Sequence, residues 1–263
     1  MTVSFTIIKY RRRFIFFAFL AMALFRLPLW FSKRCSFWKL LGSGKGGSFS
    51  KKPDLRQWAM LTVSQLNFKH VQLKHYPAQL VIRRLYGPFI GWWLRIFKCE
   101  TVTYLLVPVE GHGIWDGKNA FGDLPRKSDY DGIIAVLTRA TIRLSGQKRF
   151  WAHVQNVSNR MLQSPGFIQS YGVGEVPYFK QATFSIWDSV ASMDAYARQG
   201  AHQRAIHASA RGTFFSESMF VMIAWTDCPF FKTSDGCLMR FVHEMSDTCT
   251  RPSTPSSIST NAP

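Results

Sequence analysis

Three glycines, Gly42, Gly44 and Gly47, form the pattern G-x-G-x-x-G. In a dinucleotide-binding unit this pattern turns a strand into a helix whose N-terminus binds pyrophosphate. Here the glycines are followed by a Lys-, Ser- and Pro-containing stretch that leads to another strand. Lys45 precedes Gly46 and not the Ser or Thr of a Walker A loop. This context predicts a tight, hairpin-like turn and no nucleotide site.

The cysteines could in principle supply thiolate ligands or disulfides. They are odd in number and scattered, and they lack a C-x-x-C pair or a companion His at zinc-finger spacing. We therefore expect free thiols in a reducing compartment, with no disulfide framework and no structural zinc site. The residues are Cys35, Cys99, Cys228, Cys237 and Cys249.

Two arginines, Arg139 and Arg143, alternate with apolar residues in AVLTRATIR. In a strand, either side chain could face a pocket and bind a carboxylate. Exposure on an edge strand is the alternative, and we favour it for an unassigned arginine. Trp115 lies in the Gly-rich stretch GHGIWDGKNAFG, where it could line an apolar channel or plug a barrel mouth. Its loop position slightly favours the channel.

The elements that would position these residues occur twice. Residues 36–46 and 166–175 share the spacing Phe-x4-Gly-x-Gly at an offset of 130. Each copy lies in the same expected order, β-α-β-β-α-β. The expected strands are 3–8, 58–63 and 101–109 in the first half and 133–142, 182–187 and 218–225 in the second, and the main expected helices are 14–25, 147–162 and 189–198.

The predicted fold class is α+β, with two tandem ferredoxin-like repeats that form a unit like a dimeric α+β barrel. Packing the two sheets together, or against a second copy in a homodimer, would enclose an apolar pocket. We expect residues 1–125 to form the first repeat, with a basic, membrane-facing segment, and residues 126–228 the second. Residues 229–263, whose end is rich in Pro, Ser and Thr, are expected to be disordered.

The positive charge is concentrated in the first 100 residues, which hold 18 Lys and Arg against two acids, out of a net charge of +18. The segment 80–98 interleaves aromatic residues with basic ones, as is typical of a membrane interface. A nucleic-acid surface could use the same residue types, but no RRM, KH or zinc-knuckle signature is present, so we expect no nucleic-acid partner. The predicted contacts with an anionic membrane surface are Arg83, Arg84, Trp92, Trp93 and Arg95.

The N-terminal stretch 9–25 sets basic residues before the 12-residue apolar run from Phe14 to Phe25. Three interpretations stay open: a helix of the fold, a signal peptide and a membrane anchor. The run is short for a spanning helix, which needs about 20 apolar residues. The repeat favours a helix of the fold.

Five segments together resemble the spheroidene monooxygenase family of carotenoid ketolases. They are residues 37–49, 111–122, 135–143, 172–187 and 202–206, and their order and spacing extend the resemblance over about residues 3–227. The resemblance implies a fold among the dimeric α+β barrels, dependence on haem, and oxygenation of the C2 position of acyclic carotenoids.

Within this resemblance, His202 is the candidate ligand of the haem iron. A neutral imidazole on one side of the iron would leave the opposite site open for oxygen. A surface or helix-capping histidine is the alternative. His207 would project about 140° away around a helix, so we do not expect it to bind the same iron. Arg139 is the candidate partner of a haem propionate, and Trp115 the candidate channel residue.

We therefore expect a haem-dependent monooxygenase that introduces a keto group into an acyclic carotenoid. It would use O2 and an electron donor such as ferredoxin, and it would lie peripherally on the cytoplasmic side of a membrane. A non-catalytic protein of the same fold that binds a carotenoid or lipid is the alternative.

Overall fold

The computed structural model describes residues 1–45, 53–66, 78–198 and 215–233. Eight described strands close into a barrel in the order β1-β3-β2-β6-β7-β5-β8-β4, and their pairings are antiparallel. The predicted α+β class is confirmed. The strands are β1 Thr2–Lys9, β2 Cys35–Gly44, β3 Pro53–Ser64, β4 Glu100–Gly113, β5 Ile134–Ile142, β6 Phe167–Val176, β7 Lys180–Trp187 and β8 Phe215–Thr233.

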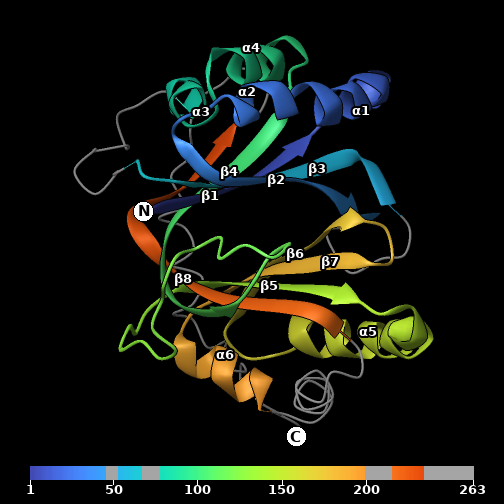
Figure 1. Cartoon of the computed structure of the whole chain (residues 1–263), viewed down its shortest axis with the longest axis vertical. Helices are drawn as coiled ribbons and strands as arrows, with labels where there is room; N and C mark the ends of the chain where they lie inside the picture. The colour runs from blue at the N-terminus through green and yellow to red at the C-terminus, as the bar shows by residue number, and fades with distance from the viewer. Residues whose placement is uncertain (46–52, 67–77, 199–214, 234–263) are drawn as a thin grey trace, which may run out of the picture.

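Helices cover the outer side of the barrel in two groups (Figure 1). One group lies over β1–β4 and the other over β5–β8. Along the chain, each half has the element order β-α-β-β-α-β. The first group is η1 Arg12–Phe14, α1 Ile15–Leu24, α2 Arg26–Trp30, α3 Ala78–Tyr86 and α4 Pro88–Ile96; the second is η4 Leu144–Gly146, α5 Gln147–Leu162 and α6 Val190–Ala197.

Alternation of side chains along the strands builds the barrel interior. In β1, Val3, Phe5 and Ile7 point inward and join a buried cluster that contains residues of all eight strands. The outward side chains of the same strand pack under helices; Ile8, for example, belongs to a second cluster with α1 and α4. Because side chains in a strand alternate between faces, one strand serves both cores.

The N-terminal helix is part of the fold. Its apolar face rests on the sheet through Ala18 and Ala21, which are buried. The strand before it, β1, pairs with both β3 and β4, and the strand after it, β2, pairs with β3 and β6. Removal of this segment as a signal peptide would therefore remove β1 from the barrel. By length and composition alone, the helical stretch Arg12–Trp30 could cross a membrane.

Two sequence expectations need correction. Gly42 and Gly44 lie within β2 rather than in a turn, because β2 continues to Gly44, where it pairs with Pro53 of β3. Gly47 lies outside the described residues. The other expectation concerns the last strand: β8 runs to Thr233, beyond the expected end at 225 and past the start of the expected tail at 229. Residues 234–263 lie outside the described part of the chain.

Candidate functional site

Arg139 lies at the centre of a charged group at one end of the barrel. Its strand, β5, is flanked by β7 and β8, so β5 is not an edge strand. The Arg139 side chain is only 1% exposed. The expectation of an exposed edge-strand arginine is therefore wrong for Arg139. Arg143, just after β5, is exposed, and its Nε donates to the Phe215 carbonyl oxygen at 3.2 Å.

Arg139 and five other charged side chains from different segments meet here, and we call these six residues the mouth cluster. Arg139 donates through Nη1 to Glu217 and through Nη2 to Asp116, the latter at 2.8 Å. Lys39 donates to Glu175 at 2.6 Å and also to Asp116. Lys180 donates to Asp116 at 2.7 Å. The mouth cluster thus balances three bases, Lys39, Arg139 and Lys180, against three acids, Asp116, Glu175 and Glu217.

Five of these six residues lie at inward positions of their strands. In β5, Arg139 follows the buried Ala135 and Leu137 at a spacing of two. In β2, Lys39 lies between Phe37 and Leu41 in the same way. A charged residue in phase with inward apolar residues was therefore the sequence signal that could have placed each of these residues on the inward face of its strand. Glu175, Lys180 and Glu217 follow the same rule in β6, β7 and β8.

The mouth cluster favours the ionised forms of Asp116 and Glu217. Burial alone would raise the pKa of Asp116, but hydrogen bonds from Lys180 and Lys39, with the charges of Lys39 and Arg139, outweigh it and hold that pKa below its usual range. Burial likewise opposes ionisation of Glu217. Backbone N–H groups of Gly117 and Asp116 and the charge of Arg139 lower its pKa overall.

Trp115 closes the barrel next to the mouth cluster. Its side chain is fully buried, and its Nε1 donates to Glu175 Oε1 at 2.7 Å. Its ring lies 5.6 Å from that of Phe37, measured between centroids. Phe121, from the same connection between β4 and β5, is also buried in the interior cluster. The Trp115 side chain therefore fills the end of the barrel interior in this structure, and its role as a channel residue stays a prediction.

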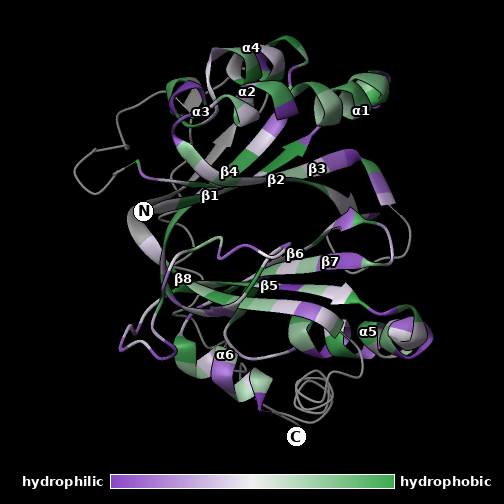
Figure 2. Cartoon of the chain, viewed as in Figure 1, coloured by the Kyte–Doolittle hydropathy of each residue, from purple (hydrophilic) through white to green (hydrophobic). Residues whose placement is uncertain are grey.

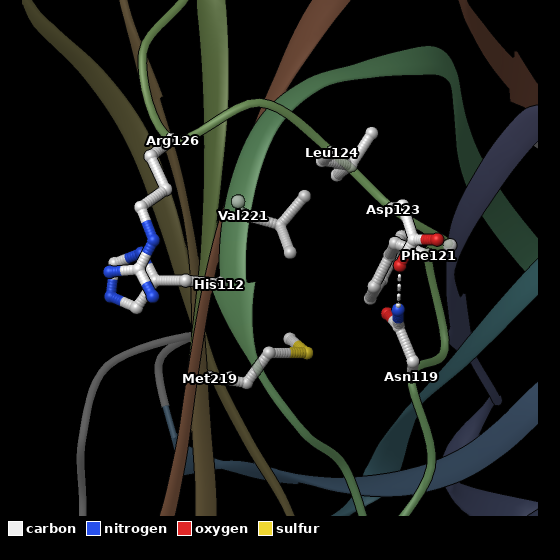
Figure 3. Close-up of a pocket in the computed structure, with 11 residues that line it drawn as sticks. His112, Asn119, Phe121, Asp123, Leu124, Arg126, Met219 and Val221 are labelled. Atoms are coloured by element: carbon white, nitrogen blue, oxygen red, sulfur yellow. Dashed lines mark hydrogen bonds between the residues drawn. The ribbon is translucent and has the colours of Figure 1, made fainter.

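A cavity of about 230 Å³ lies beneath the same connection. Phe121, Leu124 and Met219 surround it, while His112 and Arg126 lie together at one side (Figure 3). This volume is below the roughly 300–1,000 Å³ of typical small-molecule pockets. The cavity therefore leaves too little room for a polyene in this conformation.

The interior ends differently on the side away from the mouth cluster. There the Tyr104 and Tyr171 hydroxyl groups lie 3.0 Å apart, and Gln169 Nε2 donates to Tyr171 at 2.7 Å. Burial raises the pKa of both tyrosines above the ordinary value, so both stay neutral. The Tyr104 ring also contacts Phe184 and Trp225. We call Tyr104, Tyr171 and Gln169 the tyrosine group.

The predicted membrane contacts divide into two sets. Arg83, Arg84, Trp92 and Arg95 are exposed on α3 and α4. Trp93 is buried, and its Nε1 donates to the Tyr10 hydroxyl at 3.1 Å. A membrane contact through Trp93 is therefore wrong, because this side chain packs inward beneath the helices.

Of the two predicted cofactor contacts, Arg139 is in the described part of the chain and His202 is not. His202 and His207 lie outside the described residues. Arg139 already donates through Nη1 and Nη2 to two protein carboxylates, and its buried Nε has no hydrogen-bond partner among the described residues. Among the described residues, no group of three or more His, Cys, Asp and Glu side chains could hold a metal ion. Cys35 and Cys99 are free thiols, and Cys228 lies in β8.

Solved structures share this architecture. An aldoxime dehydratase matches 87% of the chain and 83% of its own length with a TM-score of 0.56 at 8% identity. An aldoxime dehydratase in complex with butyraldoxime gives 0.53 at 7% identity, over 87% of this chain and 81% of that one. At such low identity these likenesses show the fold alone.

Three curated relatives that match this chain share the name spheroidene monooxygenase. No protein-family model matches the chain. Spheroidene monooxygenase of Cereibacter sphaeroides is 34% identical over 74% of this chain, and that of Rubrivivax gelatinosus is 50% identical over 43%. The matches span 57% and 43% of those two relatives. The enzyme of Rhodobacter capsulatus is 33% identical over 76% of this chain and 79% of its own length. The chain therefore belongs to the spheroidene monooxygenase family.

Proposed function

We propose that the protein is a monooxygenase that introduces a keto group into an acyclic carotenoid. The observation that carries this proposal is the match to a spheroidene monooxygenase over 79% of that relative's length. One O2, two electrons and two protons would convert a C–H of an activated methylene to C–OH and release the second oxygen atom as water. A second round at the same carbon, followed by loss of water, gives the ketone.

The barrel interior supplies the environment that such a substrate needs. Its walls are apolar and aromatic, with Phe5 stacked on Phe184 at 4.2 Å between ring centroids. A polyene has no hydrogen-bonding groups along its chain, so burial of apolar surface must provide its binding energy. Because Trp115 and Phe121 fill the interior near the mouth cluster, we propose that the connection between β4 and β5 moves when substrate enters. In its closed position this connection would exclude water.

Haem is the cofactor that we propose, with His202 as its ligand. Bound haem iron would supply the activation of O2. The electrons would come from a donor such as ferredoxin. Arg139 stabilises the mouth cluster in this structure, so the proposal for the cofactor rests on His202 and on the family, and not on Arg139.

We also propose that the two halves are tandem ferredoxin-like repeats. The observation that supports this is the shared order β-α-β-β-α-β around a single closed barrel. In this arrangement one chain provides the eight strands that two chains provide in a dimeric α+β barrel. A homodimer of the whole chain stays a prediction, which the mass in solution would test.

The test combines an absorption spectrum with product analysis. The full-length protein, His202→Ala and the control His112→Ala would be expressed with a haem precursor and examined oxidised, reduced and with carbon monoxide. We expect a Soret band that responds to carbon monoxide in the wild type and in His112→Ala, and its loss in His202→Ala. His112 is a fair control because it is exposed and stacks on Phe220.

The product would be analysed with labelled O2, reductant and an acyclic carotenoid. Incorporation of labelled oxygen as a carbonyl supports the monooxygenase. A Soret band that survives in His202→Ala would keep haem and reject His202 as its ligand. Binding of carotenoid without haem and without product would instead favour the non-catalytic binding protein.

A further inference from the structure

We propose that the outer face of α1, α2 and α4 docks onto an anionic lipid bilayer. We call this surface the helix face. The proposal deepens the proposed function by giving the substrate's source, since a carotenoid dissolves in the bilayer and not in water. Docking itself needs no carotenoid, so it can be measured separately from catalysis.

An apolar stripe runs along the outside of α1 and α2. Phe16 is 71% exposed and Trp30 is 76% exposed, although both are large and hydrophobic. Phe19 and Leu27 lie between them and are exposed as well. The spacing is three residues within each helix and eight between Phe19 and Leu27, which keeps these side chains on one side of the helices. Figure 2 shows this hydrophobic character along α1 and α2.

The opposite sides of the same helices face the barrel. Ala18, Ala21, Phe25 and Leu29 are buried and join the cluster between the helices and the sheet. The Phe19 ring also packs against Trp58 of β3, at 5.2 Å between centroids. The other three residues of the stripe are additional apolar surface, beyond what is needed to hold α1 and α2 in place. Monomeric proteins seldom leave such contiguous patches exposed without a partner.

Helix α4 extends the stripe sideways. The Phe25 ring is 6.4 Å from Phe89 and 5.9 Å from Trp93, between centroids, which places α4 beside the start of α2. Trp92 is 55% exposed and Ile96 is also exposed, so α4 presents apolar groups outward too. The helix face thus joins three helices of the same layer (Figure 1).

The charge around the helix face has one sign. Residues 9–34 contain seven Lys and Arg and no acid, and residues 78–98 contain four and no acid. Arg26 and Arg95 lie next to the exposed apolar groups and are themselves exposed. Basic residues beside interfacial aromatic residues match anionic headgroups above acyl chains. A second copy docked through the same face would bring positive charge against positive charge, and nucleic acid would leave the apolar stripe exposed.

The helix face would lie along the membrane rather than cross it. α1 packs against β3 through its buried face, and strands of the barrel flank the helix on both sides in sequence. A helix held against the barrel in this way can insert its exposed apolar side chains to the depth of the headgroup and acyl boundary. Tryptophan at positions 30 and 92 suits that depth.

The first experiment measures binding of the full-length protein to vesicles without carotenoid. Vesicles of phosphatidylcholine with phosphatidylglycerol should float with the protein, and vesicles of phosphatidylcholine alone should bind it at least about tenfold more weakly. Phe31, directly after the last residue of α2, is 77% exposed and extends the apolar surface beside Trp30. The double variant Trp30→Ser, Phe31→Ser should weaken binding to the anionic vesicles at least about tenfold. Both residues are highly exposed, so the fold should survive.

The matched control is Leu144→Ser. Leu144 is 77% exposed but lies beside α5, on the opposite side of the barrel, and should leave binding unchanged. Equal binding of the double variant and the wild type would overturn the proposal. A second result would also overturn it: the wild type forms a dimer in solution, binds no vesicles, and dissociates into monomers in the double variant. The helix face would then be an interface between two copies of the chain.

A charge reversal separates headgroup attraction from apolar insertion. Arg26→Glu with Arg95→Glu should reduce binding to anionic vesicles at least about tenfold, since each lost basic residue alone accounts for about fivefold. Lys148→Glu, on α5, is the control. Alkaline carbonate should release the wild type from vesicles; retention would show that the chain is integral and would overturn peripheral docking. Turnover of detergent-dispersed carotenoid should persist in these variants, so failure of docking and failure of catalysis remain distinguishable.

Discussion

The two ends of the barrel interior are built from the same alternating strand positions but are closed by different chemistry. At one end, the mouth cluster holds Arg139 among three carboxylates with Trp115 beneath it. At the other, the tyrosine group pairs neutral hydroxyl and amide groups. Opening the first end separates the buried Arg139 guanidinium from carboxylates that are partly exposed, whereas opening the second exchanges neutral hydrogen bonds for bonds to water. The mouth cluster should therefore be the more costly end to open.

The largest effect should come from Arg139→Leu. This change leaves Glu217 and Asp116 without their shared guanidinium, so we expect a loss of about 3 kcal/mol in the free energy of unfolding, measured in urea. Arg143→Leu, at an exposed site on the same segment, should stay within about 0.5 kcal/mol. If Arg139→Leu leaves the stability unchanged and weakens haem binding, the result would instead support the predicted contact between Arg139 and a haem propionate.

A smaller loss should follow from Gly174→Ala, beside the mouth cluster. A Cβ at Gly174 would lie 2.7 Å from the Lys180 carbonyl oxygen, which is backbone and cannot move aside easily. We expect a cost of about 1–3 kcal/mol in thermal or urea unfolding. Gly42 pairs with Gly174 in the short contact between β2 and β6. A Cβ added at Gly42 would have its nearest neighbouring atoms at 3.7 Å. Gly42→Ala should therefore be tolerated, and an equal cost at both sites would show that the close approach is not the cause.

At the other end, Tyr104→Phe should cost about 1 kcal/mol. The change removes a hydroxyl that pairs with Tyr171 and Gln169 but leaves the ring contacts. Tyr178→Phe, at a half-exposed position, is the control for loss of a phenol. If Tyr104→Phe destabilises the protein more than Arg139→Leu, the ranking of the two ends is reversed.

The smallest effect concerns pH, and the two ends should respond at opposite extremes. Folding lowers the pKa of Asp116 and Glu217, so the unfolded chain binds more protons in acid and stability falls as pH drops below about 4. Burial raises the pKa of Tyr104 and Tyr171, so the folded chain holds more protons in base and stability falls above about pH 10.

Urea unfolding measured across pH should test both trends. In Asp116→Asn the loss of stability in acid should be smaller than in the wild type, by up to about 1 kcal/mol because this carboxylate is partly exposed. The alkaline slope should be reduced in Tyr104→Phe alone.

The sequence predicted the elements better than their partners. The strand 3–8 and the helix 147–162 were found because alternation and amphipathic spacing are local properties. The role of Trp93 was missed because an interfacial aromatic and a buried one look alike in a sequence. Lys39, Asp116, Glu175 and Lys180 lay inside the segments that carried the family resemblance, but nothing local indicated that they meet.

By itself, the sequence determined the α+β class, the doubled element order, the basic first half and the family. These depend on the composition and spacing of neighbouring residues, which folding does not change. The tertiary structure decided that Arg139 is buried among carboxylates, that Trp115 fills the end of the barrel interior, and that α1 and α2 join α4 in one exposed apolar face. Each of these depends on closing a barrel in which β2 meets β6 and β4 meets β8, far apart in sequence. Such pairings set which side chains share a space, and no local pattern encodes them.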